Sequence, residues 1–205
     1  MRKMDIQNQG NYDFTRNWFR NRNLPTFRDY IYPVFSNKPT VYLELGVFEG
    51  MSMVWMLQHV LTCPGSRGVG VDPWLMTTKL NEQTMEAVYQ RALHNTSQHF
   101  NCIIQRGNSA EVLRKMCSSG FYDIGLSSVD LCMVDGNHNA LAVLDDARLV
   151  YQLLKPGGIM LFDDVENDIE KADHVKQGVE MFLSEAGSKI QLAWKHGYCE
   201  AYVKE

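Results

Sequence analysis

The segment Val41-Tyr-Leu-Glu-Leu-Gly-Val-Phe-Glu-Gly50 carries the strongest fold signal in this chain. Its first five residues are bulky and mostly apolar, which predicts a buried β-strand. Beyond its first glycine, apolar residues recur at spacings of three and four, which is typical of one helical face: Val47, Met51, Val54, Leu57 and Leu61. The segment therefore predicts a strand, a glycine turn and a helix.

The same alternation continues along the chain. Further strands are predicted at Gly68–Asp72, Cys102–Gln105, Leu131–Asp135 and Ile159–Asp163. Helical faces lie between and after them, at Met85–Leu93, Ala110–Met116, Ala140–Leu154 and Ile169–Leu183. We expect Lys155-Pro-Gly-Gly158 to stop the third of these helices, and Ile190–Trp194 and Glu200–Val203 to form a hairpin.

These successive strand–helix units predict the fold class. Parallel strands need crossover connections, and those connections cover both faces of a sheet. We therefore expect an α/β fold, doubly wound, whose mostly parallel seven-stranded sheet ends in a C-terminal antiparallel hairpin. The 205 residues suit a single domain, in which residues 1–40, rich in aromatic and Arg side chains, form an irregular or helical N-terminal cap on a core at residues 41–205.

The amino-acid composition of the chain excludes some classes of partner. A net charge of -4 argues against binding to phosphate backbones, so we expect no nucleic acid partner. No apolar run approaches the roughly 18 residues that span a bilayer, and the first residues lack a signal sequence, so we expect no membrane partner. The five cysteines are an odd number without Cys-x-x-Cys spacing, which favours a reduced, cytoplasmic compartment.

Polar residues follow the predicted strands, where doubly wound folds bind ligands. Gly46 and Gly50 follow the first strand, Asp72 ends the second, and Asn108 and Ser109 follow the third. Each one also fits a purely structural role, such as a tight turn or a helix cap, and only their combination indicates a ligand site. Neither Gly-x-Gly-x-x-Gly nor Gly-Lys-Ser/Thr is present, which disfavours a nicotinamide site and a P-loop.

This combination resembles the class I S-adenosylmethionine methyltransferases, whose Rossmann-like core carries acid-x-Gly-x-x-x-Gly, then an acid, then Asp/Asn-Ser after its first three strands. The resemblance implies that S-adenosyl-L-methionine is the cofactor. It further implies that Gly46 and its neighbours pack on the methionine part, Asp72 holds the ribose and Trp74 covers the adenine. The implied cofactor-binding residues are Glu44, Gly46, Phe48, Gly50, Ser52, Asp72, Trp74, Asn108, Ser109 and Asp135.

The leader Phe14-Thr-Arg-Asn-Trp-Phe19 adds to this resemblance. It is similar to a subgroup of small-molecule O-methyltransferases whose Trp-containing leader folds near the cofactor.

A second group of acids follows the fourth and fifth predicted strands, in Asp135-Gly-Asn-His138 and Asp163-Asp164. Three carboxylates that converge in a cleft are costly unless a cation neutralises them, and Mg²⁺ or another divalent ion suits oxygen ligands. The arrangement resembles the metal site of catechol O-methyltransferase-like enzymes, which implies Asp135, Asp163 and Asp164 as ligands. His138 then stands where that group carries a basic side chain, so we expect His138 and Asp135 to be catalytic.

We therefore expect S-adenosylmethionine-dependent methyl transfer to a hydroxyl of a small molecule, with His138 as the base and a divalent metal, magnesium foremost. The alternatives are metal-independent O- or N-methylation, a non-catalytic cofactor-binding domain and, on fold alone, a nicotinamide oxidoreductase. The acceptor, which depends on the cap and on Leu75–Thr84, and the oligomeric state, a homodimer among the options, stay open.

Overall fold

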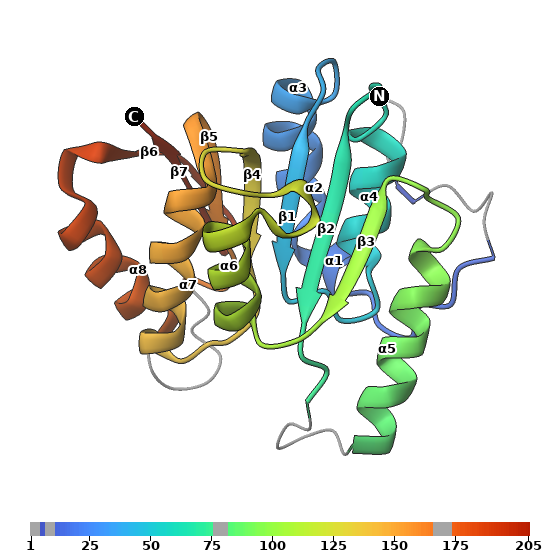
Figure 1. The fold of residues 1–205 in the computed structure, drawn as a ribbon. Helices are drawn as coiled ribbons and strands as arrows, with labels where there is room; N and C mark the ends of the chain where they lie inside the picture. Colours follow the sequence, from blue (N-terminus) through green and yellow to red (C-terminus); the bar gives the residue numbers. More distant parts are fainter. Residues whose placement is uncertain (1–4, 7–10, 76–81, 166–173) are drawn as a thin grey trace.

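The computed structural model describes residues 5–6, 11–75, 82–165 and 174–205 of the chain. Its centre is one seven-stranded sheet with the strand order β3-β2-β1-β4-β5-β7-β6 (Figure 1). All neighbours pair in parallel except β7, which is antiparallel to both β5 and β6. The predicted fold class is confirmed. The strands are β1 (Val41–Leu45), β2 (Arg67–Asp72), β3 (Cys102–Arg106), β4 (Val129–Val134), β5 (Leu154–Phe162), β6 (Ile190–His196) and β7 (Cys199–Lys204).

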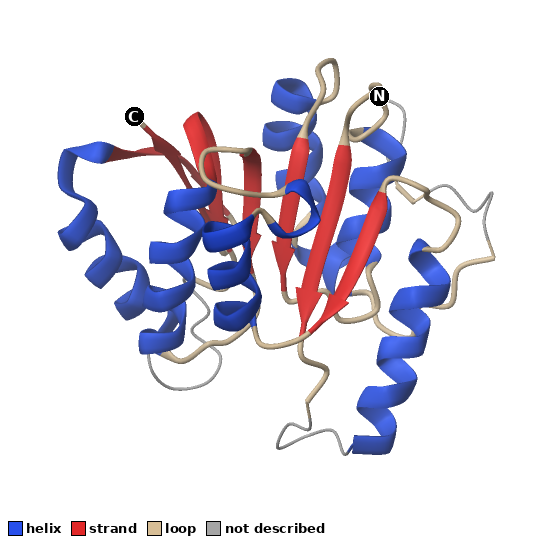
Figure 2. Ribbon diagram, viewed as in Figure 1, coloured by secondary structure: helices blue, strands red, loops and turns tan. Residues whose placement is uncertain are grey.

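Helices connect the parallel strands and cover both faces of the sheet (Figure 2). The long helices are α4 (Met51–His59), α5 (Glu82–Thr96), α6 (Ser109–Ser119), α7 (Ala140–Leu153) and α8 (His174–Ala186). Shorter helical turns are α1 (Trp18–Arg22), α2 (Leu24–Thr26), η1 (Phe27–Ile31), α3 (Tyr32–Phe35), η2 (Phe121–Asp123) and η3 (Gly187–Lys189). No helix among these described residues has the length and apolar character that crossing a membrane requires.

Alternate strand residues face two separate cores. Leu43 and Leu45 of β1 join the core beneath α6, α7 and α8, whereas Tyr42 joins the core beneath α4 and the N-terminal helices. In β4, Cys132 and Val134 likewise join the first of these cores, and Leu131 and Met133 join the second. Burial on both faces explains why these strands read as continuous apolar runs.

The N-terminal cap is helical from Trp18 to Phe35, apart from Asn23, and contributes to the second core. Phe27 has no exposed surface and meets Trp55 of α4 edge to face, with ring centroids 5.7 Å apart. Ile31 and Phe35 are buried in the same cluster. The aromatic leader is therefore part of the packed molecule, and this packing fixes one wall of the cavity described below.

One predicted boundary is wrong. We expected Lys155-Pro-Gly-Gly158 to separate a helix from a strand that begins at Ile159, but β5 already begins at Leu154. Gly157, with φ +75°, lets the chain bulge and stay paired with β4, whose register shifts between Val129 and Leu131. The predicted helix positions Ile169 and Ala172 lie outside the described residues; α8 is described from His174.

Candidate functional site

A cavity of about 960 Å³ lies at the carboxyl edge of the parallel strands, where doubly wound folds bind ligands. Its lining includes the β1–α4 loop, the ends of β2, β4 and β5, and residues of the cap and α8. Of the predicted cofactor-binding residues, seven line it: Gly46, Phe48, Ser52, Asp72, Asn108, Ser109 and Asp135. Three do not: Glu44, Gly50 and Trp74.

Gly46 brings the loop after β1 against the end of β4. Its φ is +89°, and a Cβ there would lie 1.9 Å from the carbonyl oxygen of Asp135. No side chain fits at that distance, so glycine is required both for the backbone conformation and for the close approach. The approach places Asp135 directly beside the loop that ends in Gly50.

Asp72 holds that loop in shape. Its Oδ2 accepts hydrogen bonds from the backbone N–H groups of Val47 (2.9 Å) and Phe48 (3.0 Å), and its Oδ1 accepts one from Trp74 (2.7 Å). Burial raises the pKa of the Asp72 carboxyl, and these backbone donors oppose the rise. Asp72 therefore has a structural role in holding this loop. It also lines the cavity, and its contact with a ribose stays a prediction.

Glu44 lies beneath the loop instead of on the cavity wall. It has no exposed surface, and its carboxyl accepts hydrogen bonds from the hydroxyls of Tyr42 (2.9 Å) and Ser52. Burial raises the pKa of Glu44 to about 7, against the effect of these two donors. The acid of the predicted motif thus supports Ser52, which does line the cavity.

Trp74 is buried, with 1% of its surface exposed. Its Nε1 donates to the carbonyl oxygen of Phe48 at 2.9 Å, and its ring packs on Tyr89 with centroids 4.7 Å apart. An adenine contact would require the ring to become exposed, so that role stays a prediction. The neighbouring Leu75 lines the cavity and is 66% exposed.

Asn108 and Ser109 combine a capping role with a place on the wall. The Asn108 side chain accepts from Glu111 N at 3.3 Å and caps α6. The Ser109 hydroxyl donates to Asp146 Oδ2 at 3.0 Å, and Asp146 is 2% exposed. Burial raises the pKa of Asp146 to about 6, although the bond from Ser109 lowers it. Asp146 gives no signal in the sequence, because it lies inside the apolar stripe of α7.

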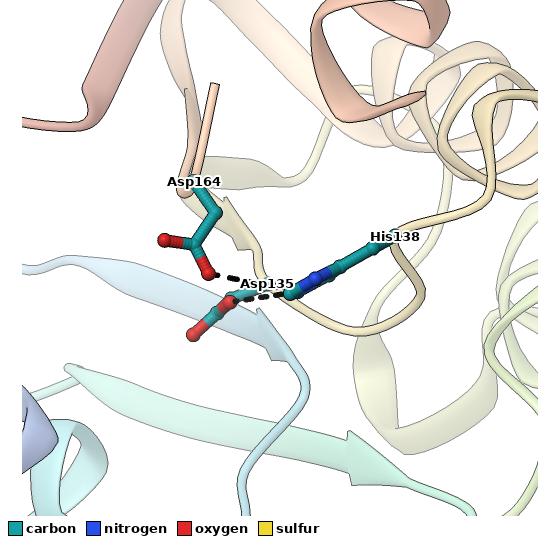
Figure 3. A group of neighbouring side chains, drawn as sticks. All are labelled: Asp135, His138 and Asp164. Atoms are coloured by element: carbon teal, nitrogen blue, oxygen red, sulfur yellow. Dashed lines mark ion pairs between the residues drawn. The ribbon is translucent and has the colours of Figure 1, made fainter. Parts of the chain in front are cut away.

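The acids at the ends of β4 and β5 meet His138 (Figure 3). His138 Nε2 lies 4.0 Å from Asp135 Oδ1 and 3.7 Å from Asp164 Oδ2. One ligand atom from each of these residues lies within 4.8 Å of the others, which is a spacing that could hold a metal ion. Arg22 of α1 also approaches Asp164, with Nη1 3.3 Å from Oδ1.

Asp163 differs from the expectation that it faces a metal with the other two acids. Its Oδ2 accepts from Asn23 Nδ2 at 2.7 Å, and its Oδ1 accepts from Cys199 Sγ at 3.1 Å. Asp163 is 7% exposed. Consecutive residues that leave a strand point in different directions, and here Asp163 points to the cap and the hairpin while Asp164 points to His138.

The charge of this cluster acts on Asp135. Removal from water raises the pKa of Asp135 well above its ordinary value, and the carboxylates of Asp163 and Asp164 raise it further. The Asp135 side chain is still 29% exposed, so these two carboxylates repel it across a partly hydrated site. A cation between Asp135 and Asp164 would relieve this repulsion, so these residues fit a divalent metal.

The N-terminal cap supplies the remaining wall. Arg16, Trp18, Phe19, Arg22 and Asn23 all line the cavity. Trp18 packs on Phe48 with ring centroids 4.7 Å apart, although 53% of Trp18 is exposed. The sequence placed this leader near a cofactor, but its arginines and Asn23 were missed because the segment shows no regular period.

Two buried polar residues fasten the cap to the loop. Glu49, 2% exposed, accepts from the backbone N–H (2.7 Å) and the hydroxyl (2.6 Å) of Thr15. Asn95 of α5, with no exposed surface, bonds to both Asp13 N and Asp13 O, at 2.7 and 3.0 Å, and to Glu49 O at 2.9 Å. We call Asp13, Thr15, Glu49 and Asn95 the latch. Sequence reasoning missed it, because a lone Glu or Asn in an apolar pattern carries no signal.

The sequence profile of a family described as "Methyltransferase domain" matches residues 43–165, which span β1 to the end of β5. A curated relative, an uncharacterized protein of Acanthamoeba polyphaga mimivirus, is 26% identical over 134 residues. The match covers 65% of this chain and 55% of the viral protein, so the chain spans only about half of that relative.

Solved structures share the fold. A Klebsiella pneumoniae protein described as an O-methyltransferase is 17% identical, with a TM-score of 0.59 over 81% of this chain and 73% of that one. A Clostridium thermocellum protein described as an rRNA methylase is 13% identical, with a TM-score of 0.62 over 90% and 98%. The fibrillarin pre-rRNA processing protein of Methanococcus jannaschii is 13% identical, with a TM-score of 0.56 over 84% and 69%. At these identities the likeness shows the fold and leaves the acceptor open.

Proposed function

The chain belongs to the methyltransferase family whose profile spans residues 43–165, and from that premise we propose that it transfers the methyl group of S-adenosylmethionine to a hydroxyl of a small molecule. Asp135 and Asp164 would hold a divalent metal such as Mg²⁺, and His138 would accept the hydroxyl proton. Asp163, committed to Asn23 and Cys199, would steady the end of β5 instead of binding the metal.

The observation that carries this proposal is that one cavity contains both sets of residues. The glycine loop and Asp72 line it, and so do Asp135, His138 and Asp164. Its volume, about 960 Å³, is near the top of the roughly 300–1,000 Å³ range of ligand pockets. That is room for a cofactor and a small acceptor together.

Methyl transfer depends mainly on how the reacting atoms are aligned. Methyl transfer is a displacement at carbon, so holding the attacking oxygen in line with the methyl group and the leaving sulfur supplies much of the rate. A bound divalent ion would lower the pKa of the acceptor hydroxyl and fix its oxygen. A neutral imidazole can accept a proton, and His138 lines the cavity with 57% of its side chain exposed. The proton would move from the acceptor oxygen to His138 Nε2.

A small acceptor fits this chain better than nucleic acid. The net charge is -4, whereas binding to phosphate backbones draws on clustered Lys and Arg. Two of the similar structures are described as rRNA-related proteins. At 13% identity, their similarity supports the fold and gives no information on the acceptor. The cavity of about 960 Å³ is the feature that favours a small molecule.

Cofactor binding is tested first, by calorimetric titration of S-adenosylhomocysteine into the wild type, Asp72→Ala and Asp72→Asn. We expect the alanine variant to bind at least about tenfold more weakly, since a buried charge-assisted hydrogen bond contributes roughly 1.5–3 kcal/mol. Asp72→Asn keeps part of the loop's hydrogen bonding and separates ribose contact from loop collapse. Asp145→Ala, an exposed site on α7, is the control. Folded wild-type protein that binds no S-adenosylhomocysteine would contradict the proposal.

The metal is tested separately, by methyl transfer to a panel of hydroxylated acceptors with Mg²⁺ and with a chelator. We expect the chelator and Asp164→Asn each to reduce the rate by about a hundredfold or more, while Asp145→Asn stays at the wild-type rate. S-adenosylhomocysteine binding should persist in all three. A rate that the chelator leaves unchanged would favour metal-independent transfer with His138 as the base.

A further inference from the structure

Resting on the proposed methyl transfer, we infer that the acceptor carries an anionic group, a carboxylate or a phosphate, next to a planar ring. The geometry assigns the ring to Trp18 and the anionic group to Arg16. Both residues belong to the cap and line the same cavity as the acid cluster.

Trp18 offers a flat apolar surface. One part of its ring packs on Phe48 of the cofactor loop, at a centroid distance of 4.7 Å and an interplanar angle of 35°. Even so, 53% of Trp18 stays exposed, in a molecule where the other described tryptophans are buried or half-buried. An exposed indole on a cavity wall is a surface on which a planar ligand can stack.

Arg16 places a positive charge over this surface. Its guanidinium carbon lies 5.9 Å from the centre of the Trp18 ring. Its backbone N–H donates to Glu49 at 3.4 Å, beside the two hydrogen bonds of Thr15, so the latch fixes the main chain on which the side chain stands. Within the described residues, the Arg16 guanidinium forms no ion pair with a carboxylate.

The acids of the cavity are largely committed to protein donors. Asp72 accepts from three backbone N–H groups, Glu49 from Thr15, and Asp163 from Asn23 and Cys199. Of the two described arginines of the cap that line the cavity, Arg22 is paired with Asp164. Arg16 is thus the cap arginine that is left for a ligand, and electrostatic complementarity favours an anionic one.

The carboxylate of the cofactor itself is the competing partner for Arg16. It would make the same charge-assisted hydrogen bond as an anionic acceptor. The two possibilities can be told apart by one measurement. If Arg16 binds the cofactor's carboxylate, the affinity for the cofactor depends on Arg16; if Arg16 binds the acceptor, it does not.

The test uses two acceptors that differ only in charge, 3,4-dihydroxybenzoate and 3,4-dihydroxybenzamide. Each is titrated into the 205-residue chain saturated with S-adenosylhomocysteine and Mg²⁺. We expect the wild type to bind the benzoate about tenfold more tightly, Arg16→Met to abolish this preference, and Trp18→Ala to weaken both compounds. Arg28→Met is the matched control, because Arg28 pairs with Asp29 and does not line the cavity.

Equal binding of the two compounds by the wild type, or binding of neither, overturns the inference. So does an Arg16→Met variant that loses S-adenosylhomocysteine affinity, because Arg16 then serves the cofactor. A wild type that binds no S-adenosylhomocysteine refutes the proposed function as well, and the first titration reveals that outcome before any acceptor is added.

Discussion

At the scale of single residues, Glu44 gives the chain a pH dependence that its surface acids do not have. The Glu44 carboxyl is fully buried and has a pKa of about 7, against an ordinary value of 4.5. Between these values the native state binds more protons than the unfolded chain. The stability that Glu44 contributes is therefore full below about pH 4.5 and is lost as the pH rises through 7.

Replacing Glu44 by Gln should remove this dependence, because an amide does not titrate and can still bond to Tyr42 and Ser52. The difference in unfolding free energy between pH 5 and pH 8 should shrink by about 3 kcal/mol, as a shift of one pKa unit corresponds to about 1.4 kcal/mol. Urea unfolding at both pH values measures it. Glu111→Gln, at an exposed site, is the control, and an unchanged pH difference in Glu44→Gln would contradict the prediction.

Which side chains line the cavity could be predicted only in part. Gly46 and Asp72 were found because a strand end followed by glycine, or by an acid, is a local pattern. The direction of Asp163 was not, since it depends on Asn23, 140 residues earlier in the chain. Burial of Trp74 likewise depends on Tyr89 and on the Phe48 carbonyl.

At the scale of elements, the loop between β1 and α4 contains two glycines with unequal tolerance. Gly50 has φ +79°, and its added Cβ would lie 3.4 Å from Thr96 Cγ2, which is an ordinary contact. At Gly46 the added Cβ would overlap the backbone of Asp135. A side chain at either position would require a strained left-handed backbone. Only at Gly46 would its Cβ also overlap backbone atoms.

We expect Gly50→Ala to lower the free energy of unfolding by about 1–2 kcal/mol, the cost of a left-handed backbone. Gly46→Ala should cost more than twice as much and separate β1 from the end of β4. Urea denaturation gives both values, and Gly187→Ala is a reference, because it has a positive φ without a nearby atom. Equal costs at Gly46 and Gly50 would show that the approach to Asp135 is looser than described.

The sequence predicted the helices and strands that have a regular apolar pattern, but it predicted their ends less accurately. Alternation of strands and helices fixed the parallel sheet, because each bulky run is buried on both faces. The start of β5 was missed because Lys155-Pro-Gly-Gly158 has the composition of a helix stop. Leu154 pairs with Val129 and Ile159 pairs with Leu131, so the residues between them bulge within β5, and Lys155 forms an ion pair of 2.7 Å with Asp130.

At the scale of the whole molecule, the latch joins the cap to the cofactor loop. Replacing Asn95 by Ala removes three hydrogen bonds, two to Asp13 and one to Glu49, from a fully buried position. We expect the amide of Thr15 to exchange with solvent at least about tenfold faster, because its segment loses one of its two anchors.

Hydrogen exchange checks this, with the amides of β4 as the internal reference. Asn101→Ala is the control variant, since Asn101 bonds to Leu61 and Ser66, away from the cap. Unchanged protection at Thr15 in Asn95→Ala would mean that Glu49 alone holds the cap in place.

The latch also sets an order of events during synthesis. Asp13 and Thr15 are synthesised before their partners, because Glu49 follows 34 residues after Thr15 and Asn95 follows 82 residues after Asp13. Loop-closure entropy opposes such distant contacts until their partners exist. The cap is thus made before the residues that hold it, and its aromatic leader lacks these partners until Asn95 has been made.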